Sequence, residues 1–231
     1  NNIRQAITYS MNVIGARCLT SLVSDSTAYD YLELFWFRRC FWAGIFLFSP
    51  ANTNSSYTVT KRKCLLLPFA SIANDGIYQK PTYYTKVLDR QGNILLESVP
   101  SQTRIIKSSS AALLTNAMED VISSDPLITI NTESHQLVNF VKFDSMTLAG
   151  KSGTTTSGSD VWFIGYSPYY TCGIWSGYDD SKVLSNGTEY HKTIWQKIMA
   201  RIHTDLDNKD FVFTDELESA KDLQQVRSSC S

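Results

Sequence analysis

The stretch 148–180 reads LAGKSGTTTSGSDVWFIGYSPYYTCGIWSGYDD and decides how the rest of this chain is interpreted. Near its start, Lys151, Ser152, Gly153 and Thr154 place an ammonium group, two hydroxyls and a position without a side chain within four residues. In an extended strand Lys151 and Gly153 face one side and Ser152 and Thr154 the other, although a twisted edge strand can bring both kinds of group to one cleft. A glycine inside a strand lets another backbone approach closely. We therefore expect a strand edge against which a ligand carboxylate docks.

Two alternating segments follow this strand. Asp160 to Ser167 and Tyr170 to Tyr178 alternate large apolar residues with small ones, and Ser167-Pro168-Tyr169 joins them. Alternation on both sides of a short turn predicts a β-hairpin. Together with the K-S-G strand, the hairpin predicts three neighbouring antiparallel strands.

The same stretch carries a resemblance to a known family. K-S-G-T-T, then D-V-W-F-I-G-Y-S-P-Y-Y-T, then I-W-S-G-Y-D resembles the transpeptidase domain of class A penicillin-binding proteins. K-T-G is one of three motifs of that wider serine acyltransferase group, beside S-x-x-K and S-x-N or S-D-N. The tryptophans, glycines and proline recur at matched spacing. The resemblance implies an α+β fold in which helices flank an antiparallel sheet, as in penicillin-binding transpeptidases and β-lactamases.

The composition bounds the class of protein. A length of 231 residues with 43% hydrophobic residues fits one domain or a large piece of one. A net charge of -1 gives no basic surface, so we reject nucleic acid as a partner. No run of about 20 apolar residues predicts a spanning helix, and the helical pattern at the N-terminus argues against a signal peptide. Five cysteines without C-x-x-C spacing argue against a zinc site, leave one disulfide open, and give no reason to expect a metal or cofactor.

The N-terminal segment 3–23 has apolar residues at helical spacing, which predicts one amphipathic helix with a buried face. On it lies Ser10-Met11-Asn12, within the run RQAITYSMNVIGAR, which resembles the S-x-N helix of the family. The resemblance implies that Ser10 relays protons. It also implies that Asn12 hydrogen-bonds the amide of the substrate and helps to position the lysine of S-x-x-K.

The stretch 36–67 does not continue the resemblance. It contains no acidic residue, clusters aromatic residues and carries the basic triplet Lys61-Arg62-Lys63. One explanation is a divergent insertion that offers a hydrophobic surface to a partner or to the membrane. The other, which we favour, is translation in a shifted reading frame, because the familial sequence stops and resumes abruptly.

The other expected elements serve as scaffold. They are a helix over 26–37 capped by Ser26, a helix over 69–78 that ends at a turn glycine, a hairpin of 83–89 with 94–97, a serine-capped helix over 108–122, and a helix over 189–206 with Ile194, Trp195, Ile198, Met199 and Ile202 on its apolar face. We therefore expect residues 1–206 to form the C-terminal portion of a transpeptidase domain that is incomplete at its N-terminus. Residues 207–231 are expected to be a peripheral tail.

The nucleophile motif is missing. No lysine in the sequence has a serine three residues before it, and the nearest cases are Thr58 before Lys61 and Thr60 before Lys63. In the family S-x-x-K precedes S-x-N by several tens of residues. We therefore expect it upstream of Asn1, and we expect this chain to be inactive alone.

The remaining roles follow from the resemblance. Lys151 would stabilise the terminal carboxylate of the substrate, and Ser152 and Thr154 would hydrogen-bond it. The backbone N-H of Thr154 would form half of the oxyanion hole, and Gly153 would allow close approach. Thr155 is a weaker candidate for substrate binding. Asp160 is a weaker candidate for a residue of the site.

The implied reaction is a peptidoglycan D,D-transpeptidation on the D-Ala-D-Ala end of a stem peptide, with β-lactams acylating the same serine. The parent protein would be anchored in the bacterial cytoplasmic membrane, with an N-terminal glycosyltransferase domain and an extracytoplasmic site. Two alternatives remain open. One is a D,D-carboxypeptidase or serine β-lactamase-like hydrolase, and the other is a non-catalytic, degenerate pseudoenzyme.

Overall fold

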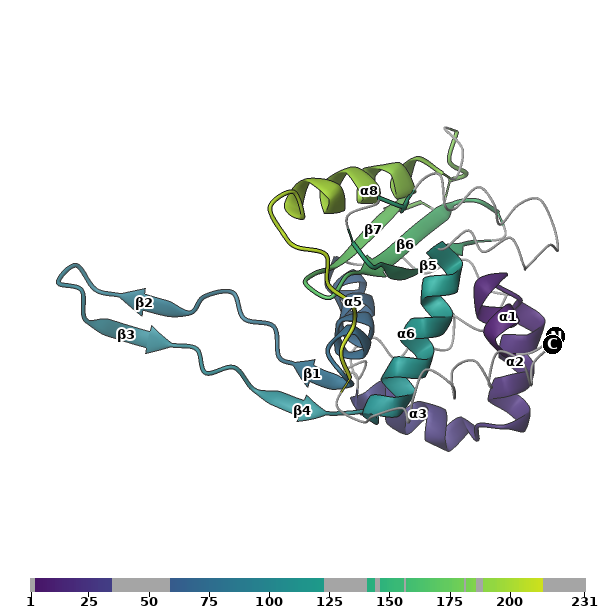
Figure 1. Ribbon diagram of the computed structural model, residues 1–231, viewed down its shortest axis with the longest axis horizontal. Coiled ribbons are helices and arrows are strands. Elements are labelled where there is room, and N and C mark those ends of the chain that lie inside the picture. The colour runs from purple at the N-terminus through teal and green to yellow at the C-terminus, as the bar shows by residue number, and fades with distance from the viewer. Residues whose placement is uncertain are drawn as a thin grey trace.

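The computed structural model describes residues 3–34, 59–122, 141–143, 146–155, 157–180, 182–185 and 189–213. Within these residues a three-stranded antiparallel sheet has helix α8 on one face and helices α5 and α6 on the other (Figure 1). The predicted α+β class is therefore confirmed.

The sheet is formed by β5 (Ala149–Thr154), β6 (Asp160–Tyr166) and β7 (Thr171–Gly177), in the order β5-β6-β7. Both pairings are antiparallel, so the three predicted strands and the hairpin between the second and third are confirmed. Ser167 holds the turn, because its hydroxyl accepts the backbone N-H groups of Tyr169 at 3.1 Å and Tyr170 at 3.0 Å. The same hydroxyl lies 2.7 Å from Nε2 of the buried His203. Because Nδ1 of that histidine faces the carbonyl of Met199 at 2.6 Å and must donate to it, Nε2 of the neutral ring accepts a hydrogen bond from Ser167.

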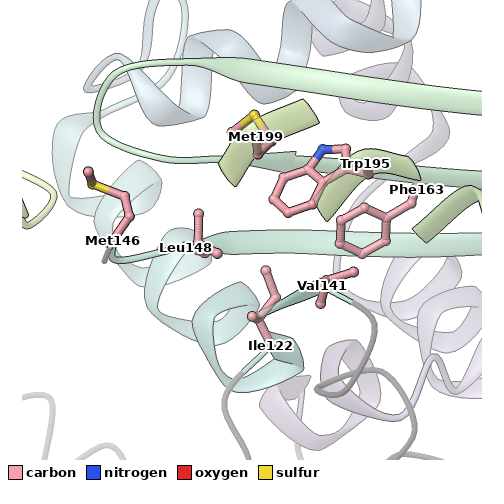
Figure 2. Packing of buried hydrophobic residues seen from close by; sticks show 7 residues of the cluster. All are labelled: Ile122, Val141, Met146, Leu148, Phe163, Trp195 and Met199. Carbon is pink, nitrogen blue, oxygen red and sulfur yellow. The ribbon is translucent and has the colours of Figure 1, made fainter. Parts of the chain in front are cut away.

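Helix α8 (Tyr190–Ile202) covers one face of this sheet. Figure 2 shows the cluster that results, with Trp195 and Met199 facing Phe163 of β6. The indole of Trp195 packs edge-on against Phe163 at 4.9 Å between ring centroids and donates its N-H to the carbonyl of Cys172 at 2.9 Å. Gly165 makes room for that indole, since a Cβ there would lie 2.5 Å from the ring.

The predicted apolar face of this helix is only partly correct. Trp195 and Met199 are fully buried, but the three isoleucines that were expected beside them are 41–44% exposed: Ile194, Ile198 and Ile202. His191 and Lys192 are buried instead. Residues 191, 195 and 199 repeat every four positions and form one stripe, and the large indole in the glycine-lined site turns that stripe toward the sheet.

Helix α6 (Ser108–Ile122) packs against the opposite face and has the predicted bounds. Its Ala111 and Met118 join a cluster with Ala149 of β5 and Tyr166 of β6. Two phenylalanines, at positions 211 and 213, pack against this cluster. These residues belong to the segment 207–231, which was expected to be a peripheral tail. The structure describes the chain only as far as residue 213.

Helix α5 (Val59–Ala73) also covers this face, and it begins and ends earlier than the predicted helix over 69–78. Asp75 and Gly76 turn the chain with φ of 56° and 76°. Gly76 is required there, because a Cβ would lie 2.3 Å from the carbonyl oxygen of Ile106. Ser108 contributes to the same turn, since its hydroxyl donates to Asp75.

A two-stranded arm follows this turn and extends away from the sheet (Figure 1). Its base pairs β1 (Ile77–Gln79) with β4 (Gln102–Arg104), and its outer part pairs β2 (Lys86–Leu88) with β3 (Ile94–Glu97). The predicted hairpin is therefore confirmed, with a bulge between Val87 and Leu88.

The N-terminal region holds α1 (Ile3–Thr8), α2 (Asn12–Ser21) and α3 (Asp25–Leu34). The prediction of one helix over 3–23 with a buried face is wrong, because the chain turns at Ser10 and no residue of α1 or α2 is fully buried. The cap of α3 is also not the predicted Ser26, since the hydroxyl of Ser24 accepts the N-H of Thr27 at 3.2 Å.

Most of the anomalous stretch 36–67 lies outside the described residues, which resume at residue 59. The part from Val59 onward belongs to helix α5. Whether the stretch is an insertion or a shifted reading frame stays a prediction.

Candidate functional site

Lys151 lies on the face of β5 that α6 covers. Ala149 packs with Ala111 and Met118 of α6, and alternation along the strand puts Lys151 on the same side as Ala149. Its ammonium group is half-buried and donates to the backbone carbonyl of Ser152 at 3.0 Å. The strand therefore holds a cation close to its own backbone.

The environment of Lys151 disfavours its charge. Burial, and after it the positive charge of Lys192 on α8, lower the pKa of Lys151 from 10.5 to about 8. The ammonium form still prevails at neutral pH. An anion that approached this lysine would replace lost solvation and would be bound more strongly than at an exposed lysine.

Three further expected residues follow on the same strand. Ser152, Gly153 and Thr154 pair with Phe163, Trp162 and Val161 of β6. In the part of the chain that the structure describes, β5 has a neighbouring strand on this side only. Its other edge can therefore accept an extended ligand by backbone hydrogen bonding.

The surroundings of Gly153 leave space on this strand. A Cβ at Gly153 would meet only Cβ of Trp162, at 3.6 Å, which is an ordinary contact. By contrast, a Cβ at Gly150 would lie 3.0 Å from atoms of three neighbouring residues. The packing of the described residues thus explains Gly150 but does not require a glycine at 153.

Thr155 holds the turn that links β5 to β6. Its hydroxyl oxygen accepts the N-H groups of Ser159 at 3.1 Å and Asp160 at 3.0 Å. The carboxylate of Asp160 accepts the indole N-H of Trp175 at 3.0 Å. These contacts give both weaker candidates a structural role.

The segment Ser10-Met11-Asn12 links α1, which ends at Thr8, to α2, which begins at Asn12. The N-H of Met11 donates to the carbonyl of Ala6 at 2.8 Å, and the N-H of Ser10 donates to that of Ile7 at 3.3 Å. With Ser10 at φ 54°, this is the Schellman motif that usually places glycine in the left-handed position. Ser10 and Asn12 are both exposed.

The two groups of expected site residues belong to segments that share one core. Helix α1 packs on α6, and α6 packs on β5. Ile7, three residues before Ser10, joins the same cluster as Ala149, two residues before Lys151. Among the described residues no hydrogen bond joins Ser10 or Asn12 to Lys151.

Sequence reasoning gave no role to Lys192 or His191, which lie on α8. Lys192 is buried, pairs with Glu189 and contributes to the lowered pKa of Lys151. His191 is buried, and burial lowers its pKa to about 4. Nothing in the local sequence marks either residue, because both effects depend on how α8 is turned.

The described residues form no metal site, because they contain no group of three or more His, Cys, Asp or Glu residues that could hold a metal ion. None of the helices built from these residues is long and apolar enough to cross a membrane. A cavity of about 550 Å³ lies between α6 and the segments 146–148 and 210–213, but no expected site residue lines it.

Comparison with known proteins identifies the family of the chain. The model of the penicillin-binding protein transpeptidase domain matches residues 65–200. Penicillin-binding protein 1A of Clostridium acetobutylicum is 28% identical over 211 residues, or 90% of this chain, and that of Clostridium perfringens is 33% identical over 170 residues, or 72% of it. The chain covers 24% and 23% of these relatives, or about a quarter of their length.

Solved structures share the fold. Penicillin-binding protein 1A of Haemophilus influenzae superposes with a TM-score of 0.69 at 19% identity, covering 93% of this chain and 36% of that protein. Penicillin-binding protein 3 of Mycobacterium tuberculosis, in complex with aztreonam, superposes with a TM-score of 0.65 at 16% identity, covering 92% of this chain and 54% of that one.

Proposed function

The chain belongs to the penicillin-binding protein transpeptidase family, and from this membership we propose that it carries the carboxylate-binding half of a peptidoglycan D,D-transpeptidase site. The observation that carries the proposal is the half-buried cation of Lys151 on a strand whose outer edge has no described neighbour. A peptide that ends in D-Ala-D-Ala offers a carboxylate for that cation and an extended backbone for that edge.

Each strand residue then has a role in binding. Lys151 stabilises the terminal carboxylate, and the hydroxyls of Ser152 and Thr154 donate hydrogen bonds to it. The N-H of Thr154 provides one donor for the tetrahedral oxyanion, where preorganised donors contribute most to acyl transfer. The space beside Gly153 supports close approach of the peptide backbone.

The N-terminal turn supplies the second set of groups. Ser10 relays a proton between the nucleophile and the leaving amine, and Asn12 hydrogen-bonds the amide of the stem peptide. A left-handed serine supports this proposal, because strained backbone at residues other than glycine concentrates at functional sites.

The covalent step needs a serine that these 231 residues do not provide as S-x-x-K. In the proposed reaction that serine attacks the carbonyl between the two D-alanines, the terminal D-Ala leaves, and the acyl group passes to a neighbouring amine. A β-lactam acylates the same serine. We place this chemistry on the outer side of the bacterial cytoplasmic membrane, in a longer protein with a membrane anchor and a glycosyltransferase domain.

The binding role is tested with a stem peptide that ends in D-Ala-D-Ala, offered to the full chain as its free acid and as its C-terminal amide. Calorimetry should show that the free acid binds and that the amide binds far more weakly. The affinity of Lys151→Met for the acid should be lower by about tenfold or more. Lys197→Met is the matched control, because Lys197 is exposed on α8. Equal binding of acid and amide would refute the proposed site.

A non-catalytic, degenerate pseudoenzyme is the second candidate, and a natural start of the protein near Asn1 would support it. Labelled penicillin separates the two when it is applied to this chain and to the polypeptide encoded with its upstream sequence. Stable labelling of the longer protein alone supports the transpeptidase. If neither protein is labelled, the non-catalytic product is supported. A separate incubation of the longer protein with the D-Ala-D-Ala peptide identifies the carboxypeptidase alternative, because that enzyme would release the hydrolysed peptide and not a cross-linked one.

A further inference from the structure

We propose that Arg4 is the positioning residue that sets Ser10 and Asn12 against Lys151, an inference that rests on the proposed function. Arg4 lies on the short helix α1, which ends at Thr8, shortly before Ser10.

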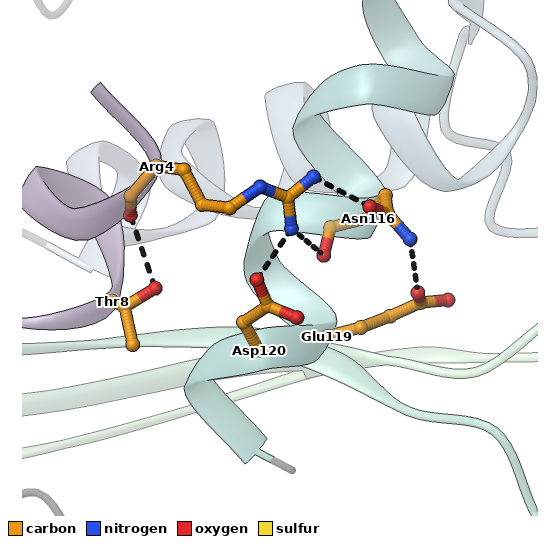
Figure 3. A network of polar contacts seen from close by, with 5 residues as sticks. All are labelled: Arg4, Thr8, Asn116, Glu119 and Asp120. Atoms are coloured by element: carbon orange, nitrogen blue, oxygen red, sulfur yellow. Dashed lines mark hydrogen bonds and ion pairs between the residues drawn. The ribbon is translucent and has the colours of Figure 1, made fainter. Parts of the chain in front are cut away.

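Helix α1 depends on its anchor. It has six residues, none fully buried, and a helix of this length is not stable by itself. Ile7 gives it one apolar contact with the cluster under α6. Arg4 gives it a network of polar contacts with α6 (Figure 3).

The network fixes both the distance and the rotation of α1. One guanidinium nitrogen of Arg4 donates to the carbonyl of Asn116 at 3.2 Å and to the carboxylate of Asp120, and the other donates to Oδ1 of Asn116 at 2.5 Å. Asn116 is held in turn by Glu119, whose carboxylate accepts its amide at 3.0 Å. The side chains of Arg4 and Asp120 are only 14% and 11% exposed, so water screens this pair weakly.

The position of Ser10 is coupled to the position of α1 through backbone hydrogen bonds. The Schellman bonds from Met11 to Ala6 and from Ser10 to Ile7 join the turn to the last residues of α1. The planar guanidinium fork restrains rotation as well as translation, which a point charge does not. A helix that turns about Ile7 would therefore move Ser10 and Asn12 relative to β5.

Arg104 offers a matched control. Its guanidinium also binds an aspartate and a backbone carbonyl, those of Asp75, with 2.8 Å to the carboxylate and 2.5 Å to the carbonyl. Both of these bonds are made to Asp75, at the base of the arm. Substitution of Arg104 therefore removes a bond to a carboxylate and a bond to a carbonyl at a place other than the anchor of α1.

The test measures geometry and binding in the full chain. Spin labels at exposed Val13 on α2 and Tyr178 after β7 are attached through unnatural amino acids, because the chain has five cysteines. Pulsed EPR should give a narrow distance distribution in the parent chain and in Arg104→Met, and a broad one in Arg4→Met. Arg4→Lys should give an intermediate width, because it keeps the charge but not the fork.

Affinity for the D-Ala-D-Ala peptide should follow the same order. We expect a loss of about tenfold in Arg4→Met, a smaller loss in Arg4→Lys and none in Arg104→Met. Asp120→Asn serves if Arg4→Met does not fold, with a loss like that of Arg4→Lys. An unchanged distribution and affinity in the Arg4 and Asp120 variants, or an equal loss in Arg104→Met, would overturn the inference. A Lys151→Met chain that binds normally would instead overturn the proposed function.

Discussion

Lys151 is held in a form that its surroundings disfavour. Its pKa falls from 10.5 to about 8, first through burial and then through the charge of Lys192. Between these two pH values the unfolded chain binds more protons than the folded chain, so the folded state gains stability as the pH rises through this window. At neutral pH the folded chain therefore carries a destabilising cation that a bound carboxylate would stabilise.

We predict that Lys151→Met raises the free energy of unfolding at pH 7 by about 1 to 3 kcal/mol, because it removes this cation. The gain should shrink as the pH rises above 8 and should vanish only above 10.5, where the lysine is neutral in both states. Urea unfolding followed by circular dichroism over this pH range measures both effects, with Lys197→Met as control. A gain that stayed constant with pH would show that the charge is not its cause.

Two glycines of the sheet should respond differently to alanine. Gly165→Ala is expected to cost about 1 to 3 kcal/mol, because the new Cβ would lie 2.5 Å from the indole of Trp195. Gly153→Ala should change stability by about 0.5 kcal/mol or less, since its nearest neighbour is 3.6 Å away, but should weaken binding of the D-Ala-D-Ala peptide. Unfolding curves and calorimetry on the same samples decide this, and a stability loss at 153 that matched the loss at 165 would contradict it.

At the scale of elements, the two faces of α8 contribute differently to the free energy of unfolding. Trp195 is fully buried and its indole N-H donates a hydrogen bond to the backbone carbonyl of Cys172, whereas Ile198 is 41% exposed. We predict that Trp195→Ala costs about 3 to 5 kcal/mol and that Ile198→Ala costs less than about 1 kcal/mol. Guanidinium unfolding measures both. Similar costs at the two positions would mean that Ile198 is packed as deeply as Trp195, which would contradict the orientation of this helix.

Sequence periodicity located these elements better than it oriented them. It predicted the bounds of α6 and the three strands of the sheet, because the turn residues and the alternating pattern are local signals. It placed the isoleucines of α8 inside, because the rotation of that helix depends on Gly165 on another element. It also joined α1 to α2, since a serine in a left-handed cap has no distinctive sequence signal.

At the scale of the whole molecule, the candidate site depends on segments that are far apart in sequence. The motif resemblance could name Ser10 and Lys151, but only the packing of α1 on α6 and of α6 on β5 relates them. The anchoring role of Arg4 and the influence of Lys192 on Lys151 could not be predicted, because both act across contacts between elements. Composition carries no positional signal and could not place the candidate site.

The central claim is that the Ser10 turn and the Lys151 strand bind one peptide terminus together. Backbone NMR spectra of the full chain, recorded during titration with the D-Ala-D-Ala peptide, test it most directly. The account predicts that the amide signals of Ser10 and Asn12 shift at the same peptide concentrations as those of Lys151 to Thr154. Shifts confined to one of the two segments, or to neither, would contradict it.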